Sequence, residues 1–205
     1  MNELKRTLNN KYKLISKIFS DDISEIWKGV DLSSEDSVYI KIYNNTKNQH
    51  NLLTRLENSR AISSDILTPV LDCFLEENKV VLILNFIDGE ILSNINWQNR
   101  PLKEKIKIVN KIIDAINRLH EDKVVHGDLS LGNIIVSNNG DIKFIDLSTS
   151  IDSIDNVDIY GSLNFSAPEV LNVPSSITYK SDWFSLGLVL YYIFEEEQLF
   201  DCLSL

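Results

Sequence analysis

The sequence predicts an α+β fold of two lobes, in which a five-stranded antiparallel sheet with one helix precedes a mainly helical part. Up to residue 87, short β-branched and aromatic runs alternate with polar turn-like segments, which is typical of antiparallel strands. After Pro101, apolar residues recur at every third or fourth position, which is typical of an amphipathic helix. We therefore expect a first lobe at 1–87 and a second at 88–205.

Composition narrows the class of protein. The chain has 205 residues, 43% of them hydrophobic, which is enough for a core. Its formal charge of −10, with scattered lysines, argues against nucleic acid or an anionic membrane as a partner. Cys73 and Cys202 lack metal-type spacing. With no signal-peptide pattern and no apolar run long enough to cross a bilayer, we expect a soluble cytoplasmic protein.

The first lobe should contain five strands and one helix. Three runs rich in β-branched and aromatic residues form an expected meander at 12–19, 24–30 and 37–43. Residues 46–62 look helical. Two further runs, 68–75 and 80–86, flank a short polar segment and predict a hairpin that completes the sheet.

The second lobe should begin with a long helix. After Pro101 the apolar face of this helix is formed by Leu102, Ile106, Val109, Ile113, Ile116 and Leu119. Strands are expected at 133–136 and 142–145, joined by a loop that contains Asn139-Gly140, a strong hairpin signal. A helix at 181–195 carries apolar residues all round, which indicates burial on every side.

Three oxygen-bearing side chains should meet at one end of the second hairpin. Asn133 enters the hairpin and Asp146 leaves it, while Asp128 lies five residues upstream. Such a set of carboxylate and amide oxygens suits magnesium, and a carboxylate that is not a ligand can orient an attacking hydroxyl. Alternatively these residues cap turns, as their types often do, but the joint spacing favours a site.

At these residues the chain resembles the eukaryotic-type Ser/Thr protein kinase family in its bacterial branch. His126-Gly127-Asp128 with Asn133 is similar to the catalytic loop, and Asp146-Leu147-Ser148 to the metal-binding D-F-G motif. Residues 161–170, GSLNFSAPEV, resemble the end of the activation segment. Residues 181–194 resemble the central buried helix. The resemblance implies a bilobal kinase-like fold that lacks the last helices of the second lobe.

The resemblance also implies roles for individual residues, with ATP and Mg²⁺ as cofactors. Asp128 would be the catalytic base, Asn133 and Asp146 the metal ligands, and Lys41 the lysine on the nucleotide phosphates. Glu57 would pair with Lys41, although a solvated helix face is its alternative placement. The expected nucleotide contacts are Ile18, Ile26, Tyr39, Lys41, Glu57, Leu84, Asn85, Phe86, Ile135 and Asp146.

Two motifs separate protein kinases from small-molecule kinases of the aminoglycoside and choline type, which share the H-G-D loop. Ala167-Pro168-Glu169 and Ser181-Asp182 favour a protein substrate, phosphorylated on Ser or Thr, with Ser162 in the position of the usual threonine. A small-molecule phosphotransferase is therefore the weaker alternative.

Several departures from the family leave a second function open. The segment at 18–24, where a glycine-rich phosphate loop is expected, has no glycine and carries two aspartates, Asp21 and Asp22. Tyr39 stands where a small alanine is usual and could close the adenine pocket. Gly127 stands where the family has an arginine that would bind a phosphorylated activation segment. Ser130 stands where Ser/Thr kinases commonly have a lysine near the transferred phosphate. The alternative is a pseudokinase that acts as a regulatory or binding module.

The helix at 181–195 leads to an expectation about assembly. Because the family continues with helices that cover this one, we expect a homodimer or a partner protein on its face. For the same reason Glu169 should be a carboxylate near the core that lacks the arginine found in the family.

Overall fold

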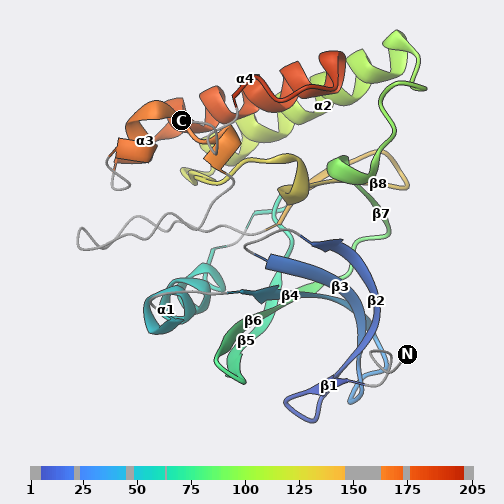
Figure 1. Cartoon of the computed structure of the whole chain (residues 1–205), viewed down its shortest axis with the longest axis vertical. Coiled ribbons are helices and arrows are strands. Elements are labelled where there is room, and N and C mark those ends of the chain that lie inside the picture. The colour runs from blue at the N-terminus through green and yellow to red at the C-terminus, as the bar shows by residue number, and fades with distance from the viewer. Residues whose placement is uncertain are drawn as a thin grey trace. The chain divides into compact units, whose positions relative to one another are not determined.

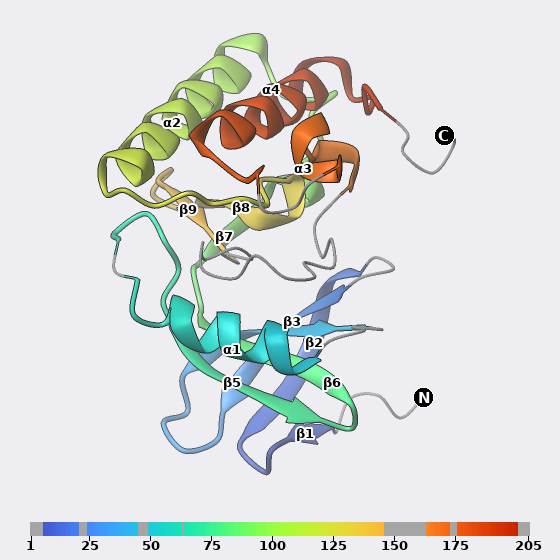
Figure 2. The same ribbon diagram turned by 90° about the vertical axis from the view of Figure 1, so that its left-hand side faces the viewer.

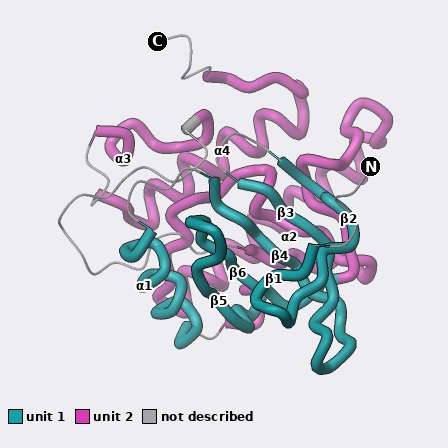
Figure 3. The backbone as a smooth tube through the Cα atoms, turned by 60° about the horizontal axis from the view of Figure 1, so that its bottom comes forward, with its two compact units in different colours: residues 1–63, 68–87 teal, residues 64–67, 88–205 magenta. Residues whose placement is uncertain are grey.

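The computed structural model describes residues 6–20, 24–44, 49–62, 64–145, 163–172 and 176–200 (Figure 1). The chain divides into two compact units, one of residues 1–63 and 68–87 and one of residues 64–67 and 88–205 (Figure 3). The short segment 64–67 thus belongs with the second unit, because Leu67 forms a parallel bridge with Phe144 and the Ile66 carbonyl accepts a hydrogen bond from the Phe144 amide at 2.9 Å.

The first unit is built on a sheet of six strands rather than the expected five. The strand order is β1-β2-β3-β4-β6-β5, and every neighbouring pair is antiparallel. The additional strand β1 pairs with the edge of β2, and its Leu8 is 1% exposed in the core. The strands are β1 (Thr7–Leu8), β2 (Tyr12–Ser20), β3 (Ser24–Asp31), β4 (Ser37–Tyr43), β5 (Val70–Glu76) and β6 (Lys79–Asn85).

The two faces of this sheet carry different side chains. Along β4, side chains alternate between the faces. Val38, Ile40 and Ile42 enter an apolar cluster with Trp27 and Tyr12. The opposite face carries the intervening residues of β4, namely Tyr39, Lys41 and Tyr43.

Helix α1 (Gln49–Ser59) packs against β5 and β6 (Figure 2). It buries Leu52, Leu56 and Ser59, which are spaced by four and three residues and therefore lie on one helix face. The helix covers residues 49–59 of the predicted segment 46–62, and residues 60–62 are not helical.

The second unit is formed by two long helices and a three-stranded sheet. Helix α2 (Leu102–Glu121) begins directly after Pro101, as predicted, and packs against α4 (Tyr179–Glu195). A capping box between Thr178 and Ser181 starts α4. The sheet has the order β7-β8-β9. The remaining elements of the second unit are β7 (Gly89–Ile91), η2 (Leu92–Asn94), η3 (Leu131–Asn133), β8 (Ile134–Ser137), β9 (Ile142–Phe144), η4 (Leu163–Phe165) and α3 (Pro168–Asn172).

Helix α4 is buried on one side within its own unit. Leu186, Val189 and Ile193 are at most 1% exposed, whereas Trp183 and Phe194 are 39% and 38% exposed. The expectation of burial on every side is therefore not met by the second unit alone. Over the part of the chain that the structure describes, no helix combines the length and apolarity needed to span a membrane.

Candidate active site

The predicted hairpin is formed by β8 and β9. Ile134 pairs with Phe144, and the Ile145 amide donates to the Asn133 carbonyl at 3.0 Å. The turn contains Asn139-Gly140, and Gly140 has φ of +81°, a conformation that favours glycine. Asn133 and Ile145 therefore lie opposite each other. Asp146, the next residue, is outside the described residues, so its predicted place beside Asn133 stays a prediction.

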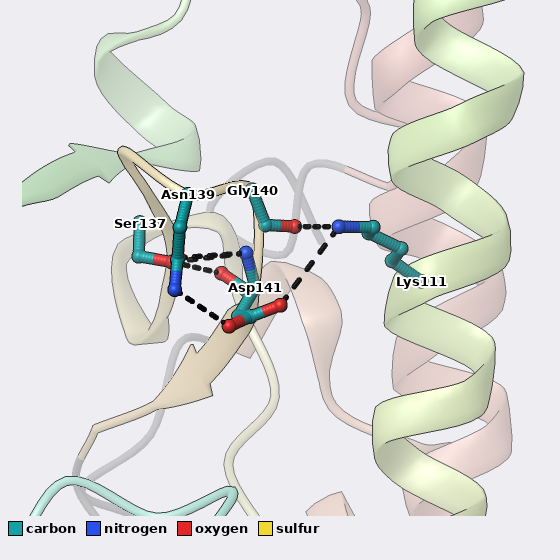
Figure 4. A network of polar contacts seen from close by, with 5 residues as sticks. All are labelled: Lys111, Ser137, Asn139, Gly140 and Asp141. Atoms are coloured by element: carbon teal, nitrogen blue, oxygen red, sulfur yellow. Dashed lines mark hydrogen bonds and ion pairs between the residues drawn. The ribbon is translucent and has the colours of Figure 1, made fainter.

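The turn of this hairpin is fixed to α2 (Figure 4). Lys111 of α2 donates to the Gly140 carbonyl and forms an ion pair with Asp141 at 3.9 Å. Asp141 in turn accepts a hydrogen bond from the Asn139 side chain at 2.8 Å. The far end of the hairpin is held in this way, which limits the freedom of the end that carries Asn133.

Asp128 and Asn133 are brought together, as the spacing predicts. The Asn133 side-chain nitrogen donates to the Asp128 carbonyl at 2.8 Å and to the Asp128 carboxylate at 3.0 Å. Asp128 is 8% exposed and Asn133 is 4% exposed. The amide thus holds both the backbone and the carboxylate of Asp128 in one orientation.

Asp182, at the start of α4, anchors the loop that carries Asp128. Its carboxylate accepts hydrogen bonds from the backbone amides of His126 and Gly127, at 2.8 and 2.7 Å. The His120 ring nitrogen Nε2 also lies 2.8 Å from the Asp182 carboxylate. Asp182 is 1% exposed, so this carboxylate is stabilised by these donors rather than by water.

Sequence reasoning did not assign these anchoring roles to Asp182 and His120. Asp182 lies 56 and 55 residues from the amides it binds, so local patterns give no sign of the contact. The available signal was its position in the Ser181-Asp182 motif, which favoured a protein substrate but did not indicate this contact.

In the first unit, Lys41 lies on β4 and is 6% exposed. Its ammonium lies 5.0 Å from the centre of the Tyr43 ring. In register, Lys41 is opposite Ile26 of β3 and Leu82 of β6, and Leu82 is opposite Cys73 of β5. Ile26, Lys41, Leu82 and Cys73 thus form one row across the sheet.

The structure does not bring Glu57 to Lys41. Between these two described residues no ion pair forms, and Glu57 is exposed. Burial, followed by the negative charge of Glu57, raises the pKa of the Cys73 thiol, which places Glu57 near β5.

Tyr39 reaches the end of the segment, Leu84 to Phe86, that was predicted to contact the nucleotide. Its hydroxyl donates a hydrogen bond to the Ile87 carbonyl at 2.9 Å, and its ring lies 4.9 Å from that of Phe86. The side chain is 2% exposed. The ring therefore lies beside Phe86, one of the predicted nucleotide contacts.

The other predicted nucleotide contacts fall into both units. Ile26, Leu84 and Ile135 are buried, Ile18 and Phe86 are half-buried, and Asn85 is exposed. Asp21, Asp22 and Ser162 lie outside the described residues.

Glu169 has a different environment from the expected one. It is exposed rather than near the core, and its carboxylate accepts a hydrogen bond from the Ser181 hydroxyl at 3.1 Å. Exposure on α3 removes the need for a buried cationic partner, because water solvates the carboxylate.

The donor set around Asn133 fits magnesium. Both hydrogen bonds of Asn133 use its side-chain nitrogen, which leaves the amide oxygen for a metal. Clusters of three or more His, Cys, Asp or Glu side chains suited to a metal do not occur within the described ranges. Asp146, the second predicted ligand, lies outside the described residues, so the magnesium site stays a prediction.

Comparisons with known proteins agree with this geometry. The family model described as "Protein kinase domain" matches residues 12–203. Protein kinase kin1 of Schizosaccharomyces pombe is 35% identical over 132 residues, covering 58% of this chain and 14% of the relative. The "Probable serine/threonine-protein kinase KIN1 homolog" of Enterocytozoon bieneusi is 32% identical over 93% of this chain and 33% of its own length.

Bacterial proteins are also similar. Serine/threonine-protein kinase PrkC of Bacillus subtilis is 25% identical over 91% of this chain and 30% of its own length. The chain thus spans about one third or less of these relatives. A crystal structure of a kinase domain matches with a TM-score of 0.70 and 20% identity, over 97% of this chain and 68% of that one, which shows the fold.

Proposed function

The chain belongs to the protein kinase domain family, and on that premise we propose that it transfers a phosphate group from ATP to a serine or threonine hydroxyl of a protein. The relatives named as serine/threonine kinases support this substrate class. They include both eukaryotic and bacterial proteins, so placement in the bacterial branch is part of the proposal.

The observation that carries this proposal is the Asp128–Asn133 pair. A carboxylate that is buried and fixed by an amide can accept the hydrogen bond of a substrate hydroxyl and direct its oxygen toward the phosphate. In the transfer, the hydroxyl oxygen forms a bond to phosphorus and the bond to the leaving diphosphate breaks. The hydroxyl proton passes to Asp128.

The other residues of the proposed site bind rather than react. Lys41 would bind the phosphate groups of ATP, and Asn133 with Asp146 would hold Mg²⁺. Bound magnesium neutralises charge on the phosphates. Asp182 keeps Asp128 in place through the backbone amides of the preceding residues. Because Ser130 supplies no positive charge beside Asp128, we expect slow transfer.

Tyr39 favours a second candidate function, that of a pseudokinase acting as a regulatory or binding module. Its hydroxyl donates a hydrogen bond to the Ile87 carbonyl, and its ring lies beside Phe86, a predicted nucleotide contact. ATP can bind only after the ring rotates away, which breaks one hydrogen bond worth about 1 kcal/mol. In a kinase, the contacts that ATP makes would outweigh this cost. In a pseudokinase they would not, and ATP would not bind.

Thermal-shift titration with ATP, with and without magnesium, tests the proposed function. We expect magnesium-dependent stabilisation of the wild type, its loss in Asp146→Asn, and its retention in Asp128→Asn. Only the wild type should transfer phosphate. Unaltered ATP binding and phosphotransfer in both variants would remove the assignment of this site.

The exposed side of α4 supports a proposal about assembly. Trp183 and Phe194 leave apolar surface uncovered on the described part of the second unit. We propose that a second copy or a partner protein covers it. Light scattering at several concentrations tests this: a monomer that binds no hydrophobic dye would contradict it.

A further inference from the structure

Lys28 of β3 contacts an aromatic ring on the face of the sheet that carries Tyr39 and Lys41. Residues opposite each other on neighbouring strands point to the same side, and Lys28 is opposite Tyr39 of β4. The Lys28 ammonium lies 4.4 Å from the centre of the Phe86 ring, within the range of a cation–π contact. Both side chains are half-buried. The lysine therefore holds a ring that directly follows the end of β6.

Phe86 in turn contacts Tyr39. The two ring centres lie 4.9 Å apart and the planes are tilted by 47°, a favourable arrangement for an aromatic pair. The Tyr39 hydroxyl donates to the carbonyl of the next residue, Ile87, at 2.9 Å. Tyr39 thus contacts two consecutive residues after β6. Lys28, Phe86 and Tyr39 form one series of contacts within the first unit.

This series affects how the Tyr39 ring can move. Tyr39 is 2% exposed, and in a close-packed interior a large ring can turn only if a neighbour gives way. Phe86 is a half-buried neighbour, so its ring can move toward solvent at a lower cost than a core residue. The contact with the Lys28 ammonium opposes that movement.

We propose that Lys28 is a positioning residue that, through Phe86, holds the Tyr39 ring in its closed position against the nucleotide. This inference rests on the proposed function, in which ATP binds after Tyr39 rotates away. Lys28 adds to the other interactions of Tyr39 and need not be the only group that holds the ring. It also need not contact the nucleotide.

Two substitutions separate the charge of Lys28 from its length. Lys28→Met keeps a long flexible side chain without a cation, whereas Lys28→Arg keeps a cation for the ring. Lys11→Met is a matched control, because the Lys11 ammonium lies 4.8 Å from the centre of the Tyr12 ring, which belongs to the apolar cluster on the opposite face. Thermal unfolding shows which variants remain folded at the temperature of the measurement.

The first measurement is the Kd for ATP with magnesium. We expect Lys28→Met to lower it about twofold to fivefold, and Lys28→Arg and Lys11→Met to leave it unchanged. The sign is diagnostic, because loss of a positive charge by itself would weaken the binding of an anionic nucleotide. Unchanged or weaker ATP binding by Lys28→Met would overturn the proposal.

A second background shows whether Lys28 acts through Tyr39. In Tyr39→Ala the ring is absent, so Lys28→Met should cause no further change in the Kd for ATP. An equal change in both backgrounds would show that Lys28 acts on the nucleotide directly, which would overturn the proposal.

The third measurement needs no ligand. The rate at which the Tyr39 ring flips is followed by NMR of ring-labelled tyrosine, and the signal is assigned by its disappearance in Tyr39→Phe. We expect flipping to be about twofold to fivefold faster in Lys28→Met than in the wild type, and unchanged in Lys28→Arg and Lys11→Met. Equal rates in the wild type and Lys28→Met would overturn the proposal.

A failure of the proposed function gives a different pattern. If neither the wild type nor Lys28→Met binds ATP, the phosphotransfer proposal fails, and the flipping rate alone decides the role of Lys28. Faster flipping in Lys28→Met but not in Lys28→Arg would still support the contact series. If only Lys28→Met binds ATP, the lysine is the group that keeps the site closed, which supports the proposal.

Discussion

The hydroxyl of Tyr39 donates a hydrogen bond to the backbone carbonyl of Ile87 at 2.9 Å. Tyr39 stands two residues before Lys41 on β4, and Ile87 follows Leu84, Asn85 and Phe86, which were predicted to contact the nucleotide. One side chain thus links the strand that carries Lys41 to this segment. If the chain binds ATP as proposed, we expect this link to open.

Removing the Tyr39 hydroxyl should strengthen ATP binding. Tyr39→Phe keeps the ring but breaks the bond to Ile87, so rotation of the ring no longer costs about 1 kcal/mol. We expect the Kd for ATP to fall by about fivefold. Isothermal titration calorimetry measures this change.

The matched control for this variant is Tyr12→Phe. Tyr12 is also buried, on the opposite face of the sheet, and its hydroxyl donates to Asp72 at 2.9 Å. Loss of the Tyr12 hydroxyl should lower the free energy of unfolding without changing the Kd for ATP. A wild type with micromolar affinity, about −8 kcal/mol, would show that the ring already rotates aside and would favour the kinase over the pseudokinase.

The buried carboxylate of Asp182 should be essential to the catalytic loop. Asp182→Asn replaces one accepting oxygen with a donor that faces a backbone amide or His120. We expect a loss of about 3 kcal/mol in the free energy of unfolding, measured by urea denaturation. Asp141→Asn on the exposed turn should cost less than about 1 kcal/mol, and similar losses for both variants would contradict the anchoring role of Asp182.

Glu25 on β3 should give the first unit an acid-sensitive contribution to stability. Burial raises its pKa, but hydrogen bonds from the Trp27 indole and from Lys17 outweigh that effect and hold the pKa below the ordinary value of 4.5. The stabilisation is therefore complete above the unfolded-state pKa and is lost as the pH falls through the lower, folded-state pKa.

The charge-neutral variant Glu25→Gln isolates this effect. At pH 7 we expect it to be less stable than the wild type by about 1 kcal/mol. The difference should shrink as the pH falls below 4.5 and through the lower, folded-state pKa of Glu25. Denaturant unfolding at several pH values measures it, and a difference that is independent of pH would contradict the assignment.

Two glycines should respond oppositely to substitution by alanine. A Cβ added at Gly187 of α4 meets nothing within 4 Å, so Gly187→Ala should stabilise the helix by about 0.5–1 kcal/mol. A Cβ at Gly29 of β3 would lie 2.3 Å from the Ile40 side chain and 2.8 Å from the Lys13 carbonyl. Gly29→Ala should therefore destabilise the sheet, and thermal unfolding compares the two.

Much of the fold could be predicted because its signals are local. Runs of β-branched and aromatic residues predicted β2, β3 and β4, and Asn139-Gly140 predicted the turn between β8 and β9. The short strands β1 and β7, of two and three residues, were missed because they are too short to show a pattern.

The site was predictable only where the sequence spacing is short. The Asp128–Asn133 contact spans five residues and follows from their motif. The position of Glu57 depends on how α1 packs across β5 and β6, which the sequence of the helix does not specify. The partner of the Tyr39 hydroxyl lies 48 residues away and depends on the path of the chain after β6.

The most direct test of the central claim is transfer of the γ-phosphate of ATP to protein in the presence of magnesium, followed with labelled ATP. We expect incorporation into Ser or Thr by the wild type, and faster incorporation by Tyr39→Phe. Asp128→Asn should lose transfer while it still binds ATP. Equal incorporation by the wild type and Asp128→Asn, or none by the wild type and Tyr39→Phe despite bound ATP and magnesium, would contradict a phosphotransfer site centred on Asp128.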